Sequence, residues 1–174
     1  MKRILTVFVA ALMAVTMVNA KDYKHSLGMY GGLGIGVQYK TMVKENFTII
    51  VEEGYALCPS RTANVGGYNS LATNAVFAYQ TGALAEGQGI KLSVYAGGQA
   101  KLHYVFDNAA LIGFGAAAGI EANMTNAPIA FSFDFRPGYG CMLLDNASYG
   151  IAPNGISAGH IFDYSLNLGV RYTF

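Results

Sequence analysis

The chain has 174 residues, of which 12% are charged, with 11 Lys and Arg against 10 Asp and Glu. This length suits one domain, and a net charge of +1 gives no bulk attraction for nucleic acid. The charged fraction is about half of the roughly 25% that is usual in soluble domains, whereas 22 Gly and 12 Tyr are present. The composition therefore excludes a typical nucleic-acid-binding protein and argues against an ordinary water-exposed surface.

The first twenty residues are built like an export signal. Lys2 and Arg3 are basic, the stretch Ile4–Val18 is apolar apart from two Thr, and small residues follow at the cleavage positions. The apolar stretch, about fifteen residues long, is shorter than the roughly 20 residues of a membrane-spanning helix. We therefore expect a cleaved signal peptide at 1–20 and a single domain at 21–174.

Beyond the signal, apolar residues alternate with polar or small ones in segment after segment. Successive side chains of a β-strand point to opposite faces, so this period of two predicts strands with one apolar and one polar face. The last segment is the most regular, because every second residue in it is apolar. The predicted strands are Leu27–Val43, Phe47–Leu57, Leu71–Tyr79, Ile90–Phe106, Leu111–Asn123, Pro128–Arg136, Gly138–Leu144 and Phe162–Phe174.

Irregular points between and within these segments predict bulges and breaks. A bend or bulge is expected at Gly97-Gly98, and another at Glu52-Glu53, where two adjacent carboxylates would otherwise put one on the apolar face. Pro137 is expected to separate two strands. This break gives the even number of strands that a closed up-and-down barrel requires. With both chain ends on one side, the short turn at Asp107-Asn108 is expected on that same side.

These features predict an all-β fold, a closed up-and-down antiparallel transmembrane β-barrel of about eight strands with its apolar faces in lipid. A soluble lipocalin-like barrel would exchange the two faces, but the polar faces carry too little charge and too much Gly for a water-exposed surface. Facing inward, the charged residues are expected to form a network in the lumen. The predicted lumen charges are Lys40, Glu52, Lys91, Lys101, Glu121, Asp134, Arg136 and Arg171.

Three segments, at 34–40, 128–137 and 168–174, resemble the small outer-membrane β-barrel proteins of Gram-negative bacteria. The resemblance implies a location in the cell outer membrane, with outer-membrane lipid and the barrel-assembly machinery as partners. The alternating C-terminal residues Val170, Tyr172 and Phe174 are similar to the signal that this machinery reads. Members of this family mostly lack an assigned activity.

No catalytic or metal site is predicted, and no cofactor. His25 and Ser26 are sequence neighbours on a strand and so face opposite ways, and the three His of the chain lack metal-ligand spacing. The functional expectation is a non-enzymatic role, structural or in surface interaction, with no small-molecule ligand assigned. A small pore for ions or solutes is the main alternative, ahead of a lipid A acyl-modifying enzyme and a soluble binding barrel.

The two cysteines, Cys58 and Cys141, belong to an exported chain, in which one disulfide between them is compatible with an oxidising compartment. They fall on strands that are not neighbours in the predicted order. Two free thiols are therefore the equal alternative.

Overall fold

The computed structural model describes residues 23–58, 68–105, 109–145 and 156–174. Within these residues the secondary structure consists of strands and turns, so the fold is all-β. The strands are β1 (His25–Gly32), β2 (Gly34–Lys44), β3 (Phe47–Cys58), β4 (Tyr68–Gln80), β5 (Ala85–Gly87), β6 (Ile90–Val105), β7 (Ala109–Met124), β8 (Ile129–Asp145) and β9 (Ile156–Thr173). The predicted signal peptide at 1–20 lies outside the described residues.

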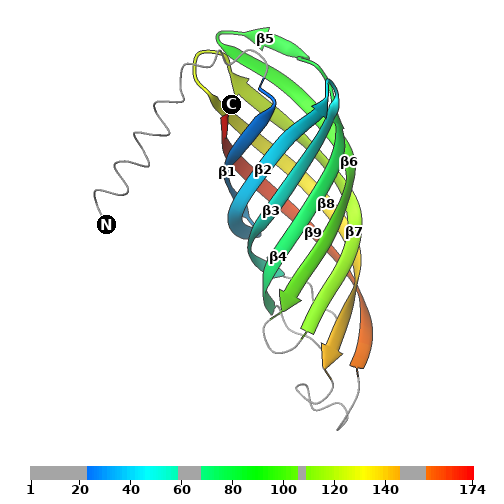
Figure 1. Ribbon diagram of the computed structural model, residues 1–174. Helices are drawn as coiled ribbons and strands as arrows, with labels where there is room; N and C mark the ends of the chain where they lie inside the picture. The colour runs from blue at the N-terminus through cyan, green and yellow to red at the C-terminus, as the bar shows by residue number, and fades with distance from the viewer. Residues whose placement is uncertain (1–22, 59–67, 106–108, 146–155) are drawn as a thin grey trace, which may run out of the picture.

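The long strands form a closed barrel, as Figure 1 shows. In the described chain each long strand pairs antiparallel with its sequence neighbours, β9 pairs with β1, and β4 pairs with β6, while the three-residue β5 adds only to one end of β6. The prediction of a closed, antiparallel, up-and-down barrel of about eight strands is confirmed. No helix among the described residues has the length and hydropathy of a membrane span.

The strand register fixes both the tilt of the strands and the side to which each face turns. A path straight across the strand pairings leaves β9 at Tyr172 and returns to β9 at Phe162, so one circuit shifts by ten residues, from 172 to 162. Such a stagger in an eight-stranded barrel corresponds to strands tilted by about 40°. Every side chain on the circuit is apolar and none is buried. The residues between the two ends are Leu27, Tyr39, Val51, Ala75, Ala100, Phe114 and Tyr139.

The adjacent circuit, which starts at Arg171 and returns to β9 at Ile161, has the opposite character between these two ends, because its residues there are polar or glycine and face the interior. It continues through Gly28, Gln38, Glu52, Asn74, Lys101, Gly113 and Gly140. The barrel thus has an apolar outer wall and a polar core.

Two of the predicted strand boundaries are wrong, although the count of eight long strands is right. The segment 27–43 forms two strands, β1 and β2, which turn at Leu33. Conversely, β8 runs through Pro137 as one strand. Proline lacks the amide hydrogen that a ladder needs, and accordingly the pairing with β7 skips from Gly115–Gly138 to Ala118–Phe135, while the pairing with β9 continues unbroken.

These two changes reverse the direction expected for the strands between them. We call the end with His25 and Phe174 the terminal end, and the end with Leu33 the far end. Because β6 descends from the terminal end, Val105 and Ala109 lie at the far end (Figure 1). The β6–β7 connection therefore belongs to the end opposite the chain termini, and not to the terminal end as expected. Asp107 and Asn108 themselves lie outside the described residues.

The expected bulges at Gly97-Gly98 and Glu52-Glu53 are absent from the described strands. The register of β6 runs continuously through both glycines, and that of β3 runs continuously through both carboxylates. Glu52 is buried, whereas Glu53 faces outward, where it accepts a hydrogen bond from the Thr73 hydroxyl at 2.5 Å.

Glycines on the inner face let two tyrosine rings lie close to the barrel wall. A Cβ added at Gly119 would lie 2.5 Å from the ring carbon Cζ of Tyr95, and one added at Gly36 would lie 2.8 Å from the ring of Tyr30. Tyr95 packs with Ile50 and Val76 in the buried apolar cluster of the interior. Small residues in the lumen therefore make room for large ones on neighbouring strands.

Candidate functional site

The barrel interior is the candidate site, because it gathers the buried charges of the described chain. Of the eight charged residues predicted to face the lumen, seven are no more than 7% exposed. The eighth, Lys91, has a side chain that is 24% exposed and lies 4.0 Å from the Glu86 carboxylate on β5. The seven buried charges form three groups along the barrel.

The first group lies at the terminal end and centres on Glu121 of β7. Its carboxylate accepts a hydrogen bond from Lys40 Nζ at 2.6 Å and another from the Arg171 guanidinium. The Tyr23 hydroxyl, just before β1, also donates to Glu121. Burial, together with the nearby Glu121 charge, raises the pKa of Tyr23, so this phenol remains a hydrogen-bond donor. Gln80 Nε2 adds a further bond, at 3.0 Å.

The second group lies in the middle of the barrel and centres on Arg136 of β8. Its Nη1 and Nη2 atoms donate to the two oxygens of Glu52 at 2.5 and 2.7 Å, and its Nε lies 2.6 Å from Asp134 Oδ1. Asp134 also accepts hydrogen bonds from the Tyr95 hydroxyl at 2.7 Å and from Asn167 Nδ2 at 3.2 Å. Two carboxylates thus surround one guanidinium, and one of them, Asp134, also accepts from two neutral donors.

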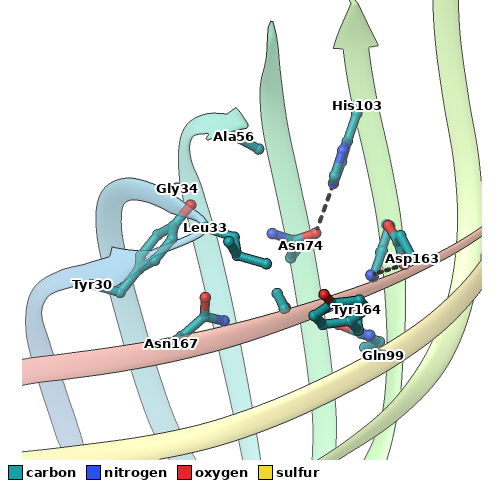
Figure 2. A pocket seen from close by; sticks show the side chains of 12 residues that line it. Tyr30, Leu33, Gly34, Ala56, Asn74, Gln99, His103, Asp163, Tyr164 and Asn167 are labelled. Carbon is teal, nitrogen blue, oxygen red and sulfur yellow. Dashed lines mark hydrogen bonds and ion pairs between the residues drawn. The ribbon is translucent and has the colours of Figure 1, made fainter. Parts of the chain in front are cut away.

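The third group lines a small cup near the far end, seen in Figure 2. Lys101 Nζ donates to Asp163 Oδ1 at 2.6 Å, and His103 Nε2 lies 3.2 Å from Asn74 Oδ1. These side chains come from β4, β6 and β9 and converge on the same space (Figure 2). Its wall combines these polar side chains with apolar and small residues such as Leu33 and Ala56.

Sequence reasoning missed several partners of these charges. Asp163 stands on the polar face of the last strand. Its odd position in the alternation, which we call its parity, was the signal by which it could have been found. Tyr23 precedes the first strand, so no alternation pattern places it. Gln38 accepts a bond from Arg171 Nη1 at 3.0 Å, but a neutral side chain on a lumen face gives no sign of which charge it will meet.

The three C-terminal residues similar to an assembly signal lie on the outer wall. Val170 and Phe174 are 51% and 41% exposed. The Phe174 amide donates to the His25 carbonyl at 2.8 Å, and the His25 amide donates to the Phe174 carbonyl at 3.0 Å. The Phe174 ring contacts those of His25 and Tyr172. The last residue thus helps to join β9 to β1.

The cysteines and histidines give no metal-binding cluster among the described residues. Cys141 is a free thiol, and the side chain of Cys58 lies outside the described part. Within the described residues no group of three or more His, Cys, Asp or Glu side chains gathers closely enough to hold a metal ion.

Comparison with known proteins adds no assignment. The sequence matches no protein-family model, and it matches none of the curated proteins. The function is therefore inferred from the barrel itself.

Proposed function

We propose that this chain is an outer-membrane β-barrel protein, exported through a signal peptide, with a non-enzymatic role in membrane structure or surface interaction. The observation that carries the proposal is the inverted polarity of the barrel. On the outer wall, Phe114, Phe162 and Leu168 are 69%, 65% and 64% exposed, whereas in the core Arg136 and Arg171 are each 1% exposed.

This arrangement suits lipid and not water. An exposed apolar patch on a soluble monomer rarely exceeds a few hundred Å², yet here the apolar side chains encircle the barrel. In a bilayer the same side chains are well solvated, and the closed barrel supplies hydrogen-bond partners to the strand backbones. An Arg or Lys turned toward the bilayer midplane would cost about 2 to 4 kcal/mol, which favours the observed burial of these residues.

The filled lumen supports a structural role in preference to a pore. Eight-stranded barrels have interiors just wide enough for side chains to fill. Here Arg136 spans from β8 to Glu52 of β3, and Lys40 spans from β2 to Glu121 of β7. Side chains that cross the lumen at two levels leave little room for an aqueous path.

The proposal is tested by fractionation combined with heat-modifiable gel mobility. We expect the chain in the outer-membrane fraction, with an unboiled form that migrates faster than the boiled one. Recovery in the soluble periplasmic fraction would contradict membrane location. Steady single-channel conductance in planar bilayers would instead favour the pore.

A further inference from the structure

The wall of the barrel has a gap beside β9. Strand β1 ends at Gly32, whose partner on β9 is Asn167, whereas β9 begins at Ile156. Residues 156–166 of β9 therefore pair only with β8 among the described strands. On the other side of the β1–β2 hairpin, the pairing with β3 begins at Gly34–Ala56. The gap lies beyond the hairpin tip, on its far-end side, between β9 and β3.

The gap falls within the apolar wall. Tyr164 and Leu166, on the β9 side, are 51% and 43% exposed, and Tyr55, on the β3 side, is 38% exposed. Phe174 exchanges backbone hydrogen bonds with β1, and backbone direction alternates along a strand, so the peptide groups of Tyr164 also face that side. No strand of the described chain lies opposite them there. Hydrocarbon cannot satisfy such groups, so a polar ligand or water at this edge would stabilise them.

Directly behind the gap is the cup near the far end. Leu33 and Gly34 of the hairpin, Ala56 of β3 and Asp163–Ser165 of β9 all line it, together with the inward side chains of β4 and β6. Figure 2 shows the hairpin and β9 on either side of this space, with His103 and Asn74 beyond. The cup therefore connects sideways to the outer wall of the barrel.

The cup offers one cation and one anion, held by different strands. The side chains of Lys101 and Asp163 are 5% and 12% exposed, and their charged atoms are 2.6 Å apart. A ligand that carries both a phosphate and an ammonium group can replace this internal pair with two charge-assisted contacts. A singly charged anion would leave Asp163 without compensation.

We infer that the cup binds the headgroup of a zwitterionic phospholipid, which enters through the gap while its acyl chains stay against Tyr164 and Leu166. The phosphate lies toward Lys101 and the ammonium toward Asp163. The headgroup also supplies polar partners for the exposed edge of β9. This inference rests on the proposed membrane location.

The test is native mass spectrometry of the full mature chain, released from micelles that contain either phosphatidylethanolamine or phosphatidylglycerol. We expect one retained phosphatidylethanolamine per chain and about tenfold weaker retention of phosphatidylglycerol. The double variant K101M/D163N removes both charges together, so neither stays buried alone, and it should lose the preference. The matched control K91M/E86Q removes the ion pair at the other end of the barrel and should keep the preference for phosphatidylethanolamine.

A second variant distinguishes loss of the binding site from misfolding of the first variant. Ser165→Phe fills the cup, removes no charge, and should abolish retention in a chain that still shows heat-modifiable mobility. Equal retention of the two lipids, retention unchanged in both cup variants, or a dimer in place of the lipid adduct would overturn the inference. Failure of the proposed function looks different, because the chain would then be soluble without micelles.

Discussion

Arg136 on β8 and Glu52 on β3 meet across the lumen through two parallel hydrogen bonds, although 84 residues separate them in the chain. Both side chains are no more than 1% exposed. Because β3 and β8 are not hydrogen-bonded neighbours, this pair ties opposite parts of the wall together. Its value to the fold depends on the charges staying matched, since a lone buried charge is strongly destabilising.

Replacing Arg136 with Met should lower the free energy of unfolding by about 3 to 5 kcal/mol. The reason is that Glu52 and Asp134 would then be buried side by side without a cation. The measurement is urea unfolding in lipid vesicles, followed by loss of the faster-migrating gel form. Lys91→Met, which removes a partly exposed pair, should cost no more than about 1 kcal/mol. Similar losses in both variants would contradict a role for the buried network.

Glu121→Gln should destabilise the barrel by a comparable amount, about 3 to 5 kcal/mol, because Lys40 and Arg171 would lose the carboxylate that lies between them. The effect should persist in 1 M salt, since buried pairs are screened far less than exposed ones. Glu86→Gln on β5 serves as the exposed control. Recovery of stability by added salt would place the pairing in solvent and refute the buried site.

Glycine at position 119 should be needed for the packing of Tyr95. Gly119→Ala puts a Cβ 2.5 Å from the tyrosine ring and 2.7 Å from Asp134 Cβ, so we expect a loss of about 1 to 3 kcal/mol from overpacking. Gly98→Ala on the adjacent strand meets only one atom, at 3.7 Å, and should be neutral or slightly stabilising. If both changes have the same effect in vesicle unfolding, the close approach is not a constraint.

Removing the Phe174 ring should reduce assembly more than stability. The ring is 41% exposed and contacts the rings of His25 and Tyr172, while the backbone bonds to β1 survive in Phe174→Ala. We expect a lower level in the outer-membrane fraction with near-normal refolding in vesicles. Phe162→Ala, at the other end of the same strand, should leave the membrane level unchanged. An equal fall in both would argue against recognition of the C-terminus.

Sequence reasoning could place the faces of the strands because burial imposes a period of two on any barrel strand. Arg136, Glu52 and Arg171 were expected inside from parity alone, and the structure buries them. Parity carries no information on partners across the lumen, because those depend on tilt and stagger. The contact between Arg171 and Glu121 follows only once the registers of β9 with β8 and of β8 with β7 are known.

Turns were harder to place, and the β1–β2 hairpin shows why. Gly31 pairs with Ile35, so two odd-numbered residues face each other across the turn at Leu33. Apolar alternation therefore continues through the hairpin as if the strand were straight. The sequence signals that mark it are the glycine-rich run around Gly32 and a predicted segment of 27–43 that exceeds the roughly 9 to 11 residues of a membrane strand.

The most direct test of the account is the environment of two adjacent residues on β9. Leu166 is 43% exposed on the outer wall, whereas Asn167 is 5% exposed and donates a hydrogen bond to Asp134. Spin labels placed singly at these positions in vesicles are compared by collision with oxygen, which partitions into lipid, and with a water-soluble nickel chelate. The account predicts that the label at 166 collides mainly with oxygen and that the label at 167 is shielded from both reagents. A label at 167 in contact with lipid, with that at 166 in contact with water, would contradict it.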